Sequence, residues 1–199
     1  MTGEQLRELQ AFFSSRAAGW EQRFPNDDPR YAAAVRELAP APGGRALDVG
    51  CGTGRALPLL AQAVEATSLV VGLDATPEML AEARRLGRDR FTLLVLADGE
   101  TLPFRADVFQ AIFAAGFVPH LADPAAGFAE LARVTAPAGR LAIFHPISRA
   151  ALAARHGQTP SEDDVTAPVR LRPLLASAGW RLDSIDDGAD RYLALATRV

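Results

Sequence analysis

Three glycines stand within five residues in the segment LDVGCGTG, residues 47–54. Glycine loses more conformational freedom on folding than any other residue, so such a cluster indicates a backbone that must turn sharply or lie against another molecule. The glycines come directly after a short apolar run that ends at Val49. Two interpretations fit: a tight strand-to-helix turn, or a loop that lets a ligand approach the main chain.

Acidic residues end the next two apolar runs. Asp74 closes VVGLD, 20 residues after Gly54, and Asp98 closes FTLLVLAD. A carboxylate at the tip of a second strand can accept hydrogen bonds from both hydroxyls of a ribose, as in dinucleotide-binding folds. Asp98 can accept from an exocyclic amine, with the N–H of Gly99 free for a ring nitrogen. The alternatives are a helix cap for Asp74 and a simple Asx-turn for Asp98.

Asp48, two residues before the first of these glycines, helps to indicate which kind of nucleoside the loop would bind. The dinucleotide pattern G-x-G-x-x-G requires a glycine three residues after Gly52, where this chain has Arg55. The Asp48 carboxylate would repel a pyrophosphate but not a ligand that bears an ammonium group. These features favour a nucleoside with a zwitterionic amino-acid tail over NAD. A structural role for Asp48, fastening the glycine loop, fits the sequence equally well.

Alternating strands and helices must position these residues. We expect strands at residues 45–50, 68–74, 91–98, 108–116 and 139–146, with helices at 55–64, 76–87 and 123–134 between them. Such alternation predicts parallel strands with helices on both faces of one sheet. A helix at 169–178 and a closing β-hairpin at 180–199 follow, so the last strand should be antiparallel. Helical segments at 4–20 and 31–38 precede the Pro/Gly-rich connector before the first strand.

Composition excludes several classes of protein. The chain has 199 residues, 49% of them hydrophobic, which is typical of a globular protein, and no apolar run approaches the roughly 20 residues that span a bilayer. A single cysteine excludes an intramolecular disulfide framework and a cysteine-built zinc site. The net charge of −3, without a basic block, argues against a nucleic-acid partner. Because the N-terminus lacks a secretion signal, we expect a cytoplasmic protein that binds neither nucleic acid nor membrane.

The stretch LDVGCGTG…GLDATPEML…ADGETLPF…VFQAIFAAGFVPHLADP…ELARVTAPAGRLAIF closely resembles the class I S-adenosylmethionine-dependent methyltransferases, in particular the methyltransferase type 11 group of the UbiE-like kind. The resemblance covers about residues 44–146. It implies an α/β fold: a Rossmann-like, doubly wound sheet of seven strands, mostly parallel with an antiparallel last strand. It also implies an enzyme that transfers a methyl group from S-adenosylmethionine to a small-molecule acceptor and leaves S-adenosylhomocysteine. A catalytically inactive cofactor-binding or partner-binding domain of the same fold is the alternative.

Residue by residue, the resemblance implies a cofactor site and no metal. Asp48 and the loop residues Gly50, Cys51, Gly52 and Gly54 would face the methionine part and the ribose. The other implied contacts are Asp74 to the ribose hydroxyls, Ala75 beside the adenine, Met79 close by, Asp98 and Gly99 to the adenine, and Ala115 (or Ala114) with Gly116 to the cofactor's amino group.

The sequence contains fewer signals for the acceptor site than for the cofactor site, because methyl transfer needs no side-chain base. His120 and His145 follow the fourth and fifth expected strands, and each is a candidate for a base or an acceptor contact. The alternative for His120 is packing against the following helix. His156 is expected in a surface loop, while the insert at 147–165 should shape the acceptor site.

Residues 1–40 are expected to form a helical lid or extension ahead of a methyltransferase domain at 41–199. Within this segment, Arg16, Trp20 and Phe24 are candidates to shield the methyl group from water. The alternative is that Phe12, Phe13 and Trp20 only pack a helix onto the sheet.

Overall fold

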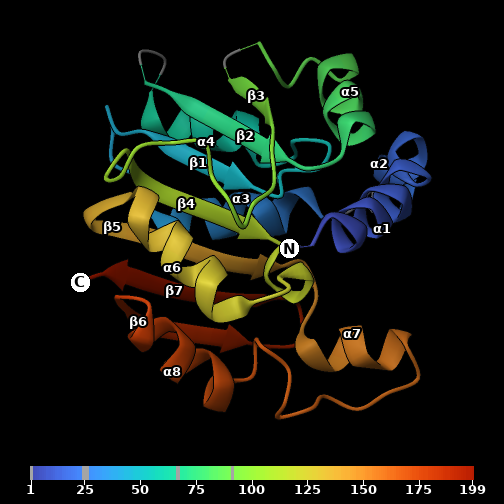
Figure 1. Ribbon diagram of the computed structural model, residues 1–199, viewed down its shortest axis with the longest axis vertical. Coiled ribbons are helices and arrows are strands. Elements are labelled where there is room, and N and C mark those ends of the chain that lie inside the picture. Colours follow the sequence, from blue (N-terminus) through green and yellow to red (C-terminus); the bar gives the residue numbers. More distant parts are fainter. Residues whose placement is uncertain (1, 24–26, 66–67, 91) are drawn as a thin grey trace.

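A seven-stranded sheet forms the centre of the computed structural model, which describes residues 2–23, 27–65, 68–90 and 92–199. The strand order is β3-β2-β1-β4-β5-β7-β6 (Figure 1). The strands are β1 (Ala46–Val49), β2 (Val70–Asp74), β3 (Leu93–Leu96), β4 (Phe109–Ala115), β5 (Thr135–His145), β6 (Trp180–Asp187) and β7 (Tyr192–Arg198). β1 to β5 pair in parallel, whereas β7 runs antiparallel to both β5 and β6. The predicted doubly wound sheet with an antiparallel last strand is therefore confirmed.

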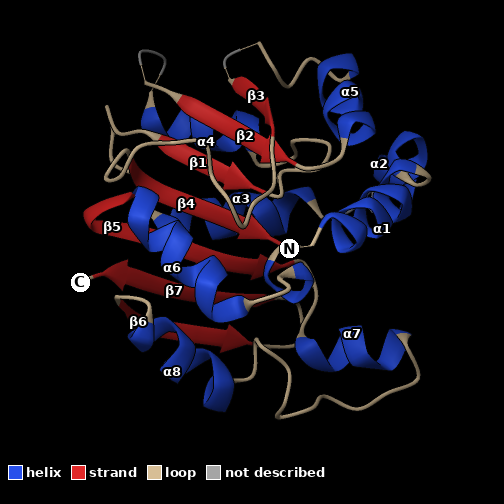
Figure 2. Ribbon diagram, in the orientation of Figure 1, coloured by secondary structure: helices blue, strands red, loops and turns tan. Residues whose placement is uncertain are grey.

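Helices cover both faces of the sheet (Figure 2). They are α1 (Gly3–Ser14), α2 (Trp20–Arg23), α3 (Asp28–Leu38), α4 (Leu57–Val64), α5 (Pro77–Arg85), α6 (Pro124–Val134), α7 (Arg149–Arg155) and α8 (Pro168–Ser177), with short 3-10 turns at Ala17–Gly19 and Val118–His120. α6 and α8 pack on one face around Phe128 and Trp180. α3 and α4 pack on the other around Leu38 and Leu57. Two separate apolar layers thus hold the sheet rigid.

Local chemistry explains most helix starts. Asp123 caps α6 by accepting a hydrogen bond from the N–H of Ala126 at 3.1 Å, and Pro124 fills the first turn, where no backbone donor is needed. Thr76 occupies the cap position of α5 as expected, but its side chain makes no capping bond. The carboxylate of Asp74 accepts from the N–H of Thr76 instead, at 2.7 Å. The second strand therefore supplies the cap of the helix that follows it.

The structure corrects the sequence prediction in four places. The helix expected at 4–20 breaks after Ser14 into α1, a 3-10 turn and α2. The helix expected at 55–64 begins at Leu57. The strand expected at 139–146 starts earlier, at Thr135, and is irregular where Ala138 has a φ of 61° and the register to β4 shifts. The insert at 147–165 contains a helix, α7, for which no prediction was made.

The carboxyl ends of β1, β2, β4 and β5 point to one edge of the molecule. Figure 1 shows α1, α2 and α7 gathered at this edge, although α7 is more than 120 residues away from α2 in the chain. Within the described ranges, every helix is too short or too polar to cross a bilayer.

Candidate ligand-binding site

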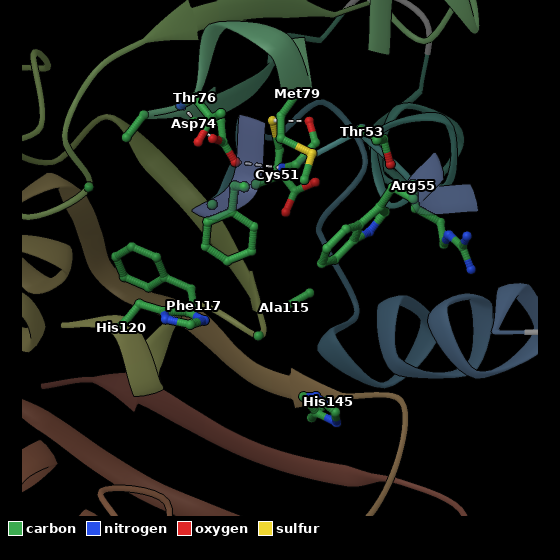
Figure 3. A pocket seen from close by; sticks show the side chains of 18 of the residues that line it. Cys51, Thr53, Arg55, Asp74, Thr76, Met79, Ala115, Phe117, His120 and His145 are labelled. Atoms are coloured by element: carbon green, nitrogen blue, oxygen red, sulfur yellow. Dashed lines mark hydrogen bonds between the residues drawn. The ribbon is translucent and has the colours of Figure 1, made fainter. Parts of the chain in front are cut away.

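A cavity of about 410 Å³ opens at the carboxyl ends of the parallel strands, where ligands bind in open α/β sheets. Its walls come from the N-terminal helices, the glycine loop, the strand tips and the insert after β5 (Figure 3). The residues predicted from the sequence that line it are Trp20, Asp48, Gly50, Cys51, Gly52, Asp74, Ala75, Met79, Asp98, Gly99, Ala115, Gly116, His120 and His145. One fold feature therefore brings together nearly all of the candidate residues.

The three loop glycines serve different purposes, although all have positive φ angles. A Cβ on Gly54 would lie 2.8 Å from Leu57 Cδ1, so this glycine lets the loop pack against α4, and it is outside the set of residues that line the cavity. A Cβ on Gly50 would lie 3.0 Å from the Phe117 ring. A Cβ on Gly52 would meet only Met79 Sδ, at 3.9 Å. Gly52 is therefore the position where bare backbone faces open space in the cavity.

Asp74 fastens this loop to the second strand. Its Oδ2 accepts from the N–H of Gly52 at 2.8 Å, and its Oδ1 accepts from Thr76 (Figure 3). Burial raises the pKa of the Asp74 carboxyl, and the hydrogen bonds from Thr76 and Gly52 oppose that rise. Each carboxylate oxygen has two lone pairs, so both can accept another hydrogen bond from the cavity side.

Asp48 lies behind the loop and is 1% exposed. Its Oδ1 is buried without a hydrogen-bond partner among the described residues. Burial raises the pKa of the Asp48 carboxyl well above its ordinary value, and the nearby charge of Asp74 adds to the rise. A buried carboxyl of this kind is costly unless a donor or cation satisfies it. Since Asp48 also lines the cavity, a positively charged or N–H-bearing ligand would meet that need.

The third strand tip forms the Asx-turn that was the alternative interpretation. Asp98 Oδ1 accepts from the N–H of Glu100 at 2.9 Å, while Asp98 still lines the cavity. Gly99 lies against the ring of Phe117, where a Cβ would come within 2.5 Å of Cε2. The turn and the adenine-type contact are thus compatible, because only one carboxylate oxygen is used by the turn.

Residues of α1 and α2 cover the cavity. Leu9, Phe13 and Trp20 line it, and the Phe13 ring meets the rings of Trp20 and His120 edge-on, at centroid distances of 5.8 and 5.2 Å. The Gln10 amide donates to the carbonyl of Ala75 at 2.8 Å, which ties α1 to the start of α5.

Of the other two residues proposed to shield the cavity, the structure places only Arg16. Arg16 lies over the ring of Phe12 and is outside the cavity lining, and Phe24 is outside the described residues.

A partly buried charge cluster, which sequence reasoning missed, holds α2 to the glycine loop. The Glu21 carboxylate accepts from Thr53 Oγ1 at 2.6 Å, from Arg55 at 3.0 Å and from Arg88 at 2.8 Å. Burial alone would raise the pKa of Glu21. The hydrogen bonds from Arg88 and Thr53 and the charges of Arg88 and Arg55 outweigh this effect and lower the pKa to about 2. The cluster joins three segments that are distant in the sequence, namely α2, the glycine loop and the turn after α5, so only the fold reveals it.

Two histidines face the cavity from the ends of β4 and β5. His145 is half-buried, and its Nδ1 lies 3.1 Å from the carbonyl oxygen of Ile147. Desolvation lowers the pKa of His145, and the charge of Arg155 contributes to the decrease. His120 is exposed at the cavity mouth, and the desolvation of its packed side lowers its pKa as well. Both imidazoles are therefore held mostly neutral at pH 7.

The insert contributes lining residues that the sequence did not single out. Ser148 caps α7 by accepting from the N–H of Ala151, and the helix then presents Leu152, Arg155 and His156 to the cavity. His156, expected in a surface loop, is exposed but lies at the cavity rim. Four alanines and two arginines in seven residues gave a helical composition but no signal for a site.

Neither a nucleophile nor a metal centre was found in the described part of the chain. Burial raises the pKa of the Cys51 thiol well above its ordinary value, so this residue stays a thiol and contributes a small apolar surface. No cluster of three or more histidine, cysteine or acidic side chains suited to a metal ion occurs among the described residues.

Comparison with known proteins links this geometry to a family. Residues 47–143 match the family model described as "Methyltransferase domain". The chain is 37% identical over 111 residues to a demethylmenaquinone methyltransferase of Corynebacterium kroppenstedtii, which covers 56% of this chain and 45% of that protein. It is 35% identical over 115 residues to an aklanonic acid methyltransferase of Streptomyces sp. (strain C5), covering 56% and 52%. The chain thus spans about half the length of these two curated relatives.

A solved structure agrees in fold. The crystal structure of a SAM-dependent methyltransferase from Aquifex aeolicus superposes with a TM-score of 0.71 at 24% identity, covering 85% of this chain and 89% of that one. The similarity extends beyond the segment matched by the family model, because it covers 85% of this chain whereas the family model matches residues 47–143.

Proposed function

Residues 47–143 belong to the methyltransferase domain family, and from this premise we propose that the protein transfers the methyl group of S-adenosylmethionine to a small-molecule acceptor. The observation that carries the proposal is the row of acidic groups at three strand tips around one cavity. Asp48, Asp74 and Asp98 all line it, and Asp48 keeps a buried oxygen without a partner among the described residues. A ligand with an amine, a ribose and an ammonium group supplies donors for all three.

The cofactor fits the residues present. In this proposal Asp74 accepts from the ribose hydroxyls, and Asp98 with Gly99 binds the adenine. Gly52 and Gly116 leave bare backbone toward the methionine part, since a Cβ on Gly116 would meet nothing within 4 Å. Asp48 provides negative charge that suits an ammonium and a sulfonium. A pyrophosphate would meet this same negative charge, which disfavours NAD.

When bound, S-adenosylmethionine supplies an electrophilic methyl group on a sulfonium. The work of the chain is then to hold the acceptor in line with that methyl group and to keep water away. Phe13 and Trp20 supply the apolar cover. We assign residues 1–40 to a helical lid or extension ahead of a domain at 41–199; in this extension α1 and α2 cover the cavity, while α3 packs on the sheet.

Proton removal falls to His145 when the acceptor atom carries a proton. Nδ1 lies 3.1 Å from the carbonyl oxygen of Ile147 and 3.3 Å from its N–H, and in the tautomer whose Nδ1–H donates to that carbonyl, Nε2 has a free lone pair that can accept this proton. His120 is the second candidate, from the opposite side of the cavity mouth. An acceptor that is already anionic needs neither histidine.

Isothermal titration calorimetry of the protein with S-adenosylmethionine and with NAD⁺ tests the proposal. Asp98→Asn keeps the Asx-turn through its amide oxygen, but replaces the other oxygen by an NH₂ that cannot accept from adenine. We expect S-adenosylmethionine to bind, NAD⁺ not to bind, and Asp98→Asn to weaken S-adenosylmethionine binding by about 10-fold. The matched control is Asp190→Asn, at an exposed position away from the cavity.

The opposite pattern would refute the proposed function: NAD⁺ binding, or no S-adenosylmethionine binding. Binding without formation of S-adenosylhomocysteine over a broad panel of acceptors would favour the inactive-domain alternative.

A further inference from the structure

Opposite charges occupy the two ends of the cavity. Its acidic side chains follow the neighbouring strands β1, β2 and β3: they are Asp48, Asp74, Asp98 and Glu100. The other end carries the Arg155 guanidinium, beside the imidazoles of His145 at the tip of β5 and His156 in the insert after it. β2 and β5 are separated by β1 and β4, three strand spacings or about 14 Å. Figure 3 shows Asp74 and His145 on opposite sides of the space.

The other two charged residues of the lining do not alter this polarity, because they face each other. Asp27 Oδ2 lies 3.9 Å from the Arg55 guanidinium, which also pairs with Glu21 and Asp28. Arg55 is therefore surrounded by carboxylates and is unavailable for an anion from the cavity.

Arg155 differs from Arg55 in this respect. It makes no ion pair or hydrogen bond through its side chain with any residue of the described ranges, and it lies at the cavity wall beside His145 and His156. A guanidinium has five donors in a planar fork that matches a carboxylate, and charge-assisted hydrogen bonds of this kind are stronger than neutral ones. The basic end of the cavity is therefore suited to an anionic group.

Apolar side chains line the space between the two ends. Phe13 and Trp20 come from the lid, Leu121 follows His120, and Ile147 and Leu152 belong to the insert. Aromatic and aliphatic walls of this kind favour a ring or another flat apolar body over a sugar-like molecule.

We propose that the methyl acceptor is an apolar, ring-containing organic acid whose anionic group binds Arg155 and His156 while its ring lies among these apolar side chains. This inference rests on the proposed function, because it assigns the acidic end of the same cavity to the cofactor. In this inference Arg155 determines which acceptor binds. It takes no part in the methyl transfer, which occurs where the cofactor binds.

Calorimetric titration of the protein saturated with S-adenosylhomocysteine tests this assignment. The probes are 1-naphthoic acid and 1-naphthamide, which share ring and shape but differ in charge. The variants are Arg155→Ala, Arg155→Lys, which keeps the charge without the fork, and Arg172→Ala, which removes an exposed arginine from α8.

We expect the wild type and Arg172→Ala to bind naphthoate at least about 10-fold more tightly than naphthamide. Arg155→Ala should abolish the preference and Arg155→Lys should retain part of it, with binding of S-adenosylhomocysteine unchanged in every variant. Equal binding of the two probes by the wild type, a preference that survives in Arg155→Ala, or no binding of either probe would overturn the inference.

Two results distinguish a failure of this inference from a failure of the proposed function. Loss of S-adenosylhomocysteine binding in Arg155→Ala alone would reassign Arg155 to the cofactor and overturn the inference, but would leave the proposed function intact. Failure of S-adenosylhomocysteine to bind the wild type would refute the proposed function itself.

Discussion

Asp74 at the tip of β2 accepts a hydrogen bond from the backbone N–H of Gly52, the loop residue after β1, at 2.8 Å. One strand tip thereby sets the position of the loop that follows its neighbour in the sheet. The same carboxylate caps α5 through Thr76, so three segments meet at one side chain.

Removal of this carboxylate should destabilise the protein as well as weaken ligand binding. For Asp74→Ala we expect the free energy of unfolding to fall by about 2 kcal/mol, because two buried N–H groups lose their acceptor. Asp74→Asn keeps one good acceptor and should lose about half as much. Urea denaturation measures both values, and an Asp74→Ala protein as stable as the wild type would contradict the role of Asp74 as a clamp.

The Glu21 cluster predicts a stability loss in acid. The folded-state pKa of Glu21, about 2, lies below its ordinary value of 4.5, so its contribution is full above pH 4.5 and is lost as the pH falls toward 2. The difference corresponds to a contribution on the order of 3 kcal/mol. The unfolding free energy of the wild type should exceed that of Glu21→Gln at pH 7, and the gap should shrink at pH 3.

Glu8→Gln is the control for this experiment, because Glu8 is exposed on α1. Urea denaturation of the three proteins at the two pH values gives the comparison. A gap that stays constant with pH would show that Glu21 does not stabilise the fold through its charge.

The contact between Phe13 and His120 predicts a measurable change in ionisation. Desolvation lowers the pKa of His120, and the Phe13 ring packs edge-on against its imidazole. Phe13→Ala should let water reach this face and raise the His120 pKa toward 6.5. NMR titration of the imidazole protons measures the change. An unchanged His120 pKa would mean that Phe13 does not desolvate this ring.

Gly99 and Gly116 should respond differently to the same substitution. In Gly99→Ala the new Cβ would meet the Phe117 ring at 2.5 Å, so we expect a loss of about 1–3 kcal/mol of stability and displacement of the ring toward the cavity. In Gly116→Ala the new Cβ would meet no neighbour. We expect only the strain of an alanine at a φ of 63°, which lowers the stability by about 1 kcal/mol. Adding Phe117→Leu should rescue Gly99→Ala but not Gly116→Ala, as measured by thermal denaturation with free energies referred to one temperature.

The sequence was sufficient for most of the sheet because β1 to β4 are short apolar runs with a glycine or an aspartate at, or within two residues of, their ends. It was also sufficient to bring Asp48, Asp74 and Asp98 together, since parallel strands end at one edge. It could not reveal that Gly50 and Gly99 make room for Phe117, or that Gly54 makes room for Leu57. Those reasons, like the partners of Glu21, depend on packing between segments distant in the chain.

Helix α7 has no fully buried residue, and Arg149 at its start is attached by ion pairs to Asp164 and Asp187. The segment is therefore fastened at its base but contributes nothing to either apolar layer, while it supplies one wall of the cavity. Substitutions at the exposed residues of α7 should therefore cost little stability while they change which molecules the cavity binds. The fold thus separates the part that must be conserved for structure from the part that is free to diversify.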